Sequence, residues 1–196
     1  MNHESLSHIF LDAFLINNFV LCVFLGMCSF LGLSAKFSTA WRMGVSVIFV
    51  ITVSAVLSYG ANQILVAVHA EYLRLIVYII IIASTVQLTE MFIKKESPAL
   101  FRELGVYLPL ITTNCAVLAV PLFQTSRNYN LVQSTVFAIA ASGGYCLAMV
   151  LLSLVRERAE LSDIPSLAKG TALTLVLASI LSLAFMGFAG IGSSGN

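Results

Sequence analysis

Charged side chains are scarce in this chain of 196 residues, since Asp, Glu, Lys and Arg together make up 10% of it. A soluble domain carries about 25%, whereas here hydrophobic residues make up 59% and the mean hydropathy is +0.98. These proportions exclude a soluble globular protein and indicate an integral membrane protein. The net charge of +1, spread over short loops, offers no face to nucleic acid. The length suits one membrane domain over residues 1–196, without a separate soluble module.

Motifs for self-contained chemistry are also missing from the sequence. The four cysteines and three histidines show no C-x-x-C or His-rich spacing, so a metal site completed within this chain is not expected. There is no P-loop, dinucleotide fingerprint or nucleophile elbow, which argues against a nucleotide site of its own. Residues 1–12 carry acidic and histidine side chains in place of a basic region, so no cleaved signal peptide is expected.

Six long apolar stretches are present instead, each close to the roughly 20 residues that cross a bilayer as a helix. They cover about 9–33, 44–68, 75–93, 104–123, 131–155 and 170–191. Short loops join them, and the sequence shows no segments of about ten residues with the alternation typical of a β-barrel. The predicted fold is therefore all-α, with six transmembrane helices.

The basic residues predict the orientation of these spans. Loops after the first, third and fifth spans carry eight basic residues, whereas the opposite side carries only Arg74 and Arg127. Because basic residues collect in cytoplasmic loops, we expect both termini on the periplasmic side of a cell inner membrane. The eight are Lys36, Arg42, Lys94, Lys95, Arg102, Arg156, Arg158 and Lys169.

The two halves of the chain share a spacing. Placing Cys28 over Cys115, 87 residues later, also carries the stretch 44–68 onto 131–155. Three spans in each half, about 9–93 and about 104–191, make the halves opposite in direction, so we expect a 3+3 inverted repeat with its site near the membrane midplane. Polar residues and prolines predict that the first and fourth spans are broken or half-helices. The polar residues, glycine and prolines that interrupt these two spans are Asn17, Asn18, Gly26, Pro109, Thr112, Thr113, Asn114 and Pro121.

Each predicted broken span carries a cysteine at the matched position, Cys28 in the first and Cys115 in the fourth. Free cysteine is most often a small buried hydrophobe, and we expect this role for Cys22 and Cys146. Small or polar residues flank Cys28 and Cys115, which leaves packing, a mutual disulfide, and a metal or redox role as alternatives. An iron–sulfur cluster takes four thiolates, so a second chain would have to supply two.

Four runs make the sequence recognisable. They are "NNFVLCVFLGMCSFLGLS" (17–34), "VQLTEMFIKKESPALFRELGVYLPLITTNCAVL" (86–118), "RERAELSDIP" (156–165) and "SLAFMGFAGI" (182–191). With these runs the sequence resembles the family of membrane subunits found in Rnf electron-transport complexes and in the sodium-pumping NADH:quinone reductase. The resemblance covers essentially the whole chain and looks closer to the Rnf A type than to the quinone-reductase E type, which stays the alternative.

This resemblance implies a concrete function. Such subunits occur as homologous pairs of opposite membrane topology, and two cysteines from each hold one [2Fe–2S] cluster inside the membrane. The family's ligand positions fall on Cys28 of "GMC" and Cys115 of "TNC". The cluster would relay electrons between cytoplasmic iron–sulfur or flavin subunits and a periplasm-facing flavin subunit, coupled to Na⁺ or H⁺ translocation. NADH, ferredoxin and flavin sites would then belong to other subunits, and no catalytic residue is expected here.

A few features keep two interpretations at this stage. Glu90 could pair with Lys94 one turn later or serve an ion pathway, and Asp12 is expected to be merely solvated. The runs "ASGGY" (141–145) and "GFAG" (187–190) are typical of close helix packing. The loop at "RERAELSDIP" could be solvated or could dock cytoplasmic subunits. An inverted-repeat transporter for ions or small solutes, and a scaffold that only anchors its neighbours, are the more distant alternatives.

Overall fold

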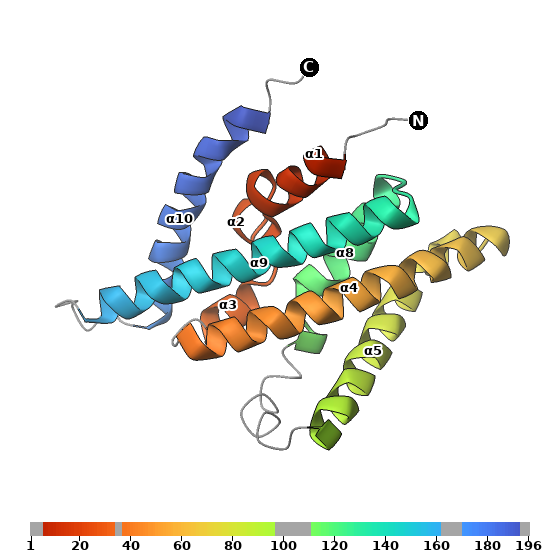
Figure 1. Ribbon diagram of the computed structural model, residues 1–196, viewed down its shortest axis with the longest axis horizontal. Coiled ribbons are helices and arrows are strands. Elements are labelled where there is room, and N and C mark those ends of the chain that lie inside the picture. Colours follow the sequence, from red (N-terminus) through yellow and green to blue (C-terminus); the bar gives the residue numbers. More distant parts are fainter. Residues whose placement is uncertain (1–5, 34–36, 97–110, 162–169, 193–196) are drawn as a thin grey trace.

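The computed structural model describes residues 6–33, 37–96, 111–161 and 170–192, and these residues form helices and turns without a strand (Figure 1). Four helices are long and apolar enough to cross a membrane, over Phe37–Ala67, Glu71–Met91, Leu131–Glu160 and Thr171–Phe188. They correspond to four of the six predicted spans. The all-α prediction is thus confirmed for the described residues, while the six-span inverted repeat stays a prediction.

Two long antiparallel helices form the centre of the molecule. They are α4 (Phe37–Ala67) and α9 (Leu131–Glu160), which lie side by side and run in opposite directions in Figure 1. Gly44 of α4 lies directly against the thiol of Cys146 in α9, and this contact leaves no room for a Cβ. A glycine and a small side chain therefore let the two helices pack closely in the core.

Two further long helices pack around this pair. The helix α5 (Arg74–Glu96) contacts α4, and the short 3₁₀ turn η2 (Glu71–Leu73) leads into it. The helix α10 (Thr171–Gly192) contacts α9 and the N-terminal pieces on the other side. Both helices expose large apolar side chains, including Ile80 and Leu183, as expected where a helix faces lipid or another protein chain.

The segment predicted as the first span is divided into short pieces. It consists of α1 (Leu6–Leu11), the π-helix η1 (Asp12–Ile16), α2 (Phe19–Cys22) and α3 (Met27–Leu33). Asn18 starts α2 as its N-cap, since its side-chain oxygen accepts from Val20 N at 3.1 Å. The Asn18 amide nitrogen also donates to Gly144 O of α9 at 2.7 Å. One polar side chain therefore restarts the helix and fixes it to the core.

The predicted fourth span is described only from residue 111 onward. Residues 111–112 are helical and are followed by a break at residues 113–114, after which α8 (Cys115–Ser126) begins and contacts α4, α5 and α9. Residues 104–110, with Pro109, lie outside the described residues. Pro121 falls inside α8 without ending it.

Candidate functional site

Cys115 is the first residue of α8, and the residue before it makes the helix start there. Asn114 is the N-cap, with extended backbone angles and a side-chain oxygen that accepts from Ala116 N at 3.0 Å. Asparagine is a preferred N-cap because its side chain satisfies a backbone N–H that the first helical turn leaves unpaired. The Asn114 side chain thus shapes the open backbone beside Cys115, while any hydrogen bond from residues 112–114 to the Cys115 thiol stays a prediction.

Cys28 has a similar place in the first turn of α3, where it is the second residue. Two residues with positive φ precede this helix, Phe24 at 56° and Gly26 at 85°. Glycine adopts such angles without a steric penalty, whereas a phenylalanine there stores strain. The thiols of Cys28 and Cys115 are both free and both exposed in this chain.

A buried polar network joins the two cysteine-bearing segments. The side-chain nitrogen of Asn114 donates to Ser29 Oγ at 3.4 Å and to Tyr145 OH at 3.3 Å. Ser29 Oγ and Tyr145 OH share a hydrogen bond of 2.6 Å, and Ser29 Oγ also donates to Gly26 O at 2.9 Å. Exposed fractions are 0% for Ser29, 2% for Asn114 and 1% for Tyr145. Because Ser29 follows Cys28 and Asn114 precedes Cys115, this network brings the two cysteine positions into one region.

Gly26 allows the segments to approach so closely. A Cβ at this position would lie 3.0 Å from Asn114 Oδ1, 3.0 Å from Tyr145 Cε2 and 3.6 Å from Ala116 Cβ. The first two distances are shorter than ordinary van der Waals contact. Gly26 therefore meets both the conformational and the steric requirement of this position.

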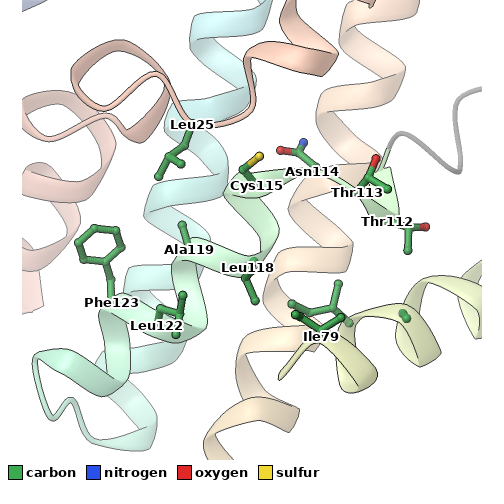
Figure 2. A pocket seen from close by; sticks show the side chains of 12 residues that line it. Leu25, Ile79, Thr112, Thr113, Asn114, Cys115, Leu118, Ala119, Leu122 and Phe123 are labelled. Carbon is green, nitrogen blue, oxygen red and sulfur yellow. The ribbon is translucent and has the colours of Figure 1, made fainter. Parts of the chain in front are cut away.

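A cavity of about 620 Å³ opens beside Cys115, between α8 and α5. Figure 2 shows Cys115 and Leu25 at one end of it, with Leu122, Phe123 and Ile79 toward the other. Thr112, Thr113 and Asn114 line the same end as Cys115. This end is the polar one, and the remainder is apolar, as is typical of sites that receive an apolar group or a helix.

The other two cysteines differ from each other. Cys146 is buried against Gly44, so its predicted packing role is confirmed. Cys22 is exposed and its thiol lies 3.4 Å from Ile16 O, so the prediction that it is a buried packing residue is wrong. Cys22 ends the short helix α2 beside the break at residues 23–26, and hydropathy alone does not reveal that the helix stops there.

Asp12 is not merely solvated, so that prediction is also wrong. Its carboxylate accepts from Asn17 Nδ2 at 2.7 Å and lies 3.4 Å from Arg127 Nη1. Arg127 also donates to Tyr129 OH at 3.0 Å and lies over the Phe137 ring. Partial burial alone lowers the pKa of Arg127, but the hydrogen bonds to Tyr129 and Asp12 raise it above its ordinary value. The cluster ties η1 to the loop between α8 and α9.

Glu90, the two glycine-containing runs and the end of α9 are the other features that the sequence singled out. Glu90 is half-buried near the end of α5, and its pairing with Lys94 stays a prediction. Gly143 and Gly144 lie against Phe14 and Asn18, which confirms close packing at "ASGGY". Among the described residues nothing lies within 4 Å of the place that a Cβ would take at Gly187, so the packing prediction for "GFAG" is not confirmed there. Arg156 pairs with Glu160 at 3.0 Å within α9. Most of the following loop, residues 162–169, lies outside the described residues.

Sequence reasoning missed Ser29 and Tyr145. Tyr145 stands at the end of a run of small residues, and the only available signal was an aromatic hydroxyl inside an apolar helix, where it needs a partner. In the described part of the chain, no three His, Cys, Asp or Glu side chains gather as a metal site would require. The candidate site in the described residues consists of two exposed thiols whose sequence neighbours, Ser29 and Asn114, belong to an uncharged buried network.

Comparison with known proteins gives consistent matches. Residues 6–192 match the model of the family described as "Rnf-Nqr subunit, membrane protein". A relative from Erwinia tasmaniensis, named as the A-type subunit of an ion-translocating oxidoreductase complex, is 48% identical over 93% of this chain and 95% of its own length. Proteins of the same name from Edwardsiella ictaluri and Serratia proteamaculans are each 47% identical, over 90% and 93% of this chain and 92% and 95% of their own lengths. The chain is therefore a multi-pass membrane protein that belongs to the Rnf-Nqr family.

Proposed function

We propose that this chain is the A-type membrane subunit of an Rnf-type ion-translocating oxidoreductase, and that Cys28 and Cys115 hold half of an intramembrane [2Fe–2S] cluster. The family match and the A-type names of the relatives support the coarse role. They also favour the A type over the E type of the quinone reductase. The observation that carries the cluster assignment is the hydrogen bond of 3.4 Å between the neighbours of the two cysteines, Asn114 and Ser29.

The donor chemistry fits the proposed group. Iron–sulfur clusters are bound through cysteine thiolates, and both thiols here are free and exposed. Each lies in the first turn of a helix, where backbone N–H groups lack intrahelical acceptors and the partial positive charge favours an anion. Two thiolates are half of what a cluster takes, and their exposure suits ligands shared with a second chain.

The residues around the thiols would keep them in place. Tyr145, Ser29 and Asn114 satisfy one another's polar groups in the buried network, so the network needs no water from outside. Their role is to position Cys28 and Cys115 and to keep that positioning rigid. A cluster bound there would supply an electron station part of the way across roughly 30 Å of hydrocarbon.

The proposed topology has six spans arranged as a 3+3 inverted repeat. The antiparallel pairing of α4 with α9 supports it, since these helices are the second and fifth predicted spans. The similar positions of Cys28 and Cys115, each in the first turn of a helix after a break, support it as well. The termini would then be periplasmic and the chain would lie in the cell inner membrane.

The partner implied by the half-site is a homologous membrane subunit of opposite topology, of the Rnf E type, which would bring the other two thiolates. Cytoplasmic iron–sulfur and flavin subunits and a periplasm-facing flavin subunit would pass electrons to and from the pair, coupled to Na⁺ or H⁺ translocation. The exposed thiols and the apolar cavity beside Cys115 are the surfaces that such an interface would cover.

Electron paramagnetic resonance tests the proposal directly. The dithionite-reduced complex is compared at low temperature for the wild type, Cys115→Ser and Cys28→Ser, with iron counted per complex. We expect each variant to lose one [2Fe–2S] signal, two irons and transmembrane electron flow. Cys22→Ser is the matched control, because Cys22 is also exposed and should leave the signal intact.

The cavity of about 620 Å³ beside the broken helices is the observation that favours a transporter as the alternative function. On that view Cys28 and Cys115 are packing residues. An unchanged spectrum and unchanged iron in both cysteine variants would favour the transporter and would remove the cluster from this chain.

A further inference from the structure

A row of buried oxygen atoms without hydrogen-bond partners follows one face of α4. Ser54, Ser58 and Asn62 are spaced four residues apart, so they share a face of the helix. Within the described part of the chain, Ser54 Oγ, Ser58 Oγ and Asn62 Oδ1 find no partner although they are shielded from solvent. Both serines are 0% exposed. Buried polar groups are normally paired, because leaving them unpaired is costly.

The orientation of the two serine hydroxyls sets them apart from their neighbours. Hydroxyls inside these helices usually donate to the carbonyl four residues earlier, as Thr52 does to Ile48 O at 2.8 Å and Ser142 does to Ala138 O at 2.7 Å. Ser54 and Ser58 do not make this bond within the described structure. Their hydroxyls therefore face the helices packed against α4 instead of their own backbone.

Gln124 of α8 places another unpaired oxygen near Ser54 and Ser58. Its side-chain nitrogen donates to Ala55 O at 3.0 Å, which fixes the side chain against α4 at the residue that follows Ser54. A carbonyl only accepts hydrogen bonds, so the amide nitrogen must face Ala55 and the orientation of the amide is determined. Gln124 Oε1 is left buried and unpaired among the described residues, with Gln124 itself only 2% exposed.

Ser134 of α9 carries another unpaired oxygen, at a similar depth along the helix pair. Gly44 meets Cys146 where α4 and α9 touch, and the helices run antiparallel. Ser58 follows Gly44 by 14 residues and Ser134 precedes Cys146 by 12, or about 21 Å and about 18 Å along the two helices. Ser134 is 1% exposed and its Oγ also lacks a partner in the described part of the chain.

The chemistry of these atoms selects the ligand class. The unpaired atoms of these five side chains are all oxygens, and none of the five is charged. Two further buried side-chain atoms without a partner in the described part of the chain, Arg74 Nε and Ser153 Oγ, are not included in the set, and Arg74 pairs through its Nη2 with Glu71 at 3.5 Å. Amide oxygens only accept, and hydroxyl and carbonyl oxygens are the ligands that hard cations prefer. A neutral set gives no carboxylate to balance a divalent ion, so a monovalent ion is the better match.

We propose that Ser54, Ser58, Gln124 and Ser134 form a binding site for a small monovalent cation within the membrane. Asn62 lies at its mouth, toward the end of α4. The choice of a cation over water alone rests on the proposed ion-translocating function. Ser54 is the eighteenth residue of the 31-residue helix α4, so the set extends from the middle of the helix toward its C-terminal end. This end is the periplasmic one in the proposed topology.

The same helix links this site to the candidate electron carrier. Gln124 lies nine residues after Cys115 in α8, or about 14 Å along the helix. In a medium of low dielectric constant, negative charge gained near Cys115 would attract a cation at Gln124. The site therefore lies where the arrival of an electron can change the occupancy of a cation.

The test uses the purified full chain in detergent micelles, with Na⁺ as the probe. Thermal stability is measured as NaCl replaces choline chloride at constant ionic strength. We expect a saturable Na⁺-specific rise in Tm for the wild type, and a half-saturating Na⁺ concentration about tenfold higher for Ser58→Ala and for Gln124→Leu. Ser142→Ala is the matched control, since Ser142 is equally buried but bonded to its own helix.

Two results would overturn the inference. One is a wild-type Tm that is the same in NaCl and choline chloride at every concentration, with Ser58→Ala more stable in both, because the oxygens would then only be hydrated. The other is an unchanged Na⁺ response in both Ser58→Ala and Gln124→Leu. Cys115→Ser should keep the Na⁺ response of the purified chain, while the same variant loses the cluster signal of the complex, so the failure of either proposal can be recognised separately.

Discussion

Asn114 and Ser29 are 85 residues apart in the sequence, and the side-chain nitrogen of Asn114 donates to Ser29 Oγ at 3.4 Å inside the protein. Each is the immediate neighbour of an exposed cysteine, Cys115 and Cys28 respectively. The bond relates two segments that have no contiguous secondary structure in common. It gives the thiol pair a fixed relationship that neither helix start could give alone.

Replacing Asn114 by alanine should separate the two cysteine segments. The variant loses an N-cap, worth about 1 kcal/mol, and two buried hydrogen bonds, so we expect a total loss of about 2–3 kcal/mol. The yield of the cross-link that dibromobimane forms between Cys28 and Cys115 in the purified chain should decrease in this variant. Asn18→Ala is the control, because Asn18 caps α2 in the same way but does not contact Ser29. An equal loss of cross-linking in both variants would contradict the positioning role.

Tyr145→Phe should be destabilising although only one oxygen atom is removed. The phenol bonds to Ser29 Oγ at 2.6 Å and accepts from Asn114 at 3.3 Å, so its loss leaves buried groups partly unpaired. We expect a cost of about 1–3 kcal/mol. A double-mutant cycle with Ser29→Ala, measured by Tm or denaturant midpoint, should be non-additive because both residues share one network. Simple additivity would mean that the two hydroxyls act independently.

Gly26→Ala should disturb the site more than most glycine replacements. Its φ of 85° disfavours any Cβ, and that Cβ would lie 3.0 Å from Asn114 Oδ1. We expect a loss of about 1–3 kcal/mol and lower retention of iron in the purified complex. Gly60→Ala lies within α4, and no described residue comes within 4 Å of its new Cβ, so this variant should instead be neutral or stabilising by about 0.5–1 kcal/mol. Equal stability of the two variants would show that Gly26 is not constrained.

Asp12→Asn should loosen the N-terminal segment only slightly. The ion pair with Arg127 spans 3.4 Å, and the arginine side chain is 40% exposed, so screening by solvent limits the expected loss to about 0.5 kcal/mol. The pKa of Arg127 is raised, so its contribution is complete at neutral pH and is lost only as the pH rises through that strongly alkaline value. Limited proteolysis near residue 17 across neutral pH should therefore show a constant difference from wild type, and a sigmoidal change near pH 7 would contradict this account.

The long helices could be predicted from the sequence because hydropathy reports them directly. The expected stretch 131–155 falls within α9, which continues to Glu160, and the expected stretch 44–68 compares with Phe37–Ala67 for α4. A membrane-spanning helix continues past the hydrocarbon core of the bilayer into polar residues. The apolar run in the sequence is therefore shorter than the helix and does not mark where the helix begins and ends. Spacing and the family resemblance together predict Cys28 and Cys115 as the site residues. Their role as cluster ligands is the proposal that the electron paramagnetic resonance experiment tests.

The polar partners could not be predicted from the sequence. Tyr145 meets Ser29 across 116 residues, and nothing local in either segment specifies that pairing. The predictions for Cys22 and Asp12 are wrong for the same reason. The residue at which α2 ends and the position of Arg127 both depend on tertiary contacts. The unpaired oxygen atoms of α4 follow from packing, since the sequence alone shows only two serines and an asparagine at helical spacing.

The hydrogen bond from Asn18 to Gly144 has a consequence for biogenesis. The donor emerges from the ribosome 126 residues before its acceptor, which at about 5–20 residues per second is a delay of about 6 to 25 s. During that interval the short helices α1, α2 and α3 lack the helix on which they are anchored. This N-terminal segment, residues 6–33, therefore cannot complete its packing until α9 has been made. Only then can Ser29 reach Tyr145, so the order of translation sets the earliest moment at which the segments that carry Cys28 and Cys115 can be held together.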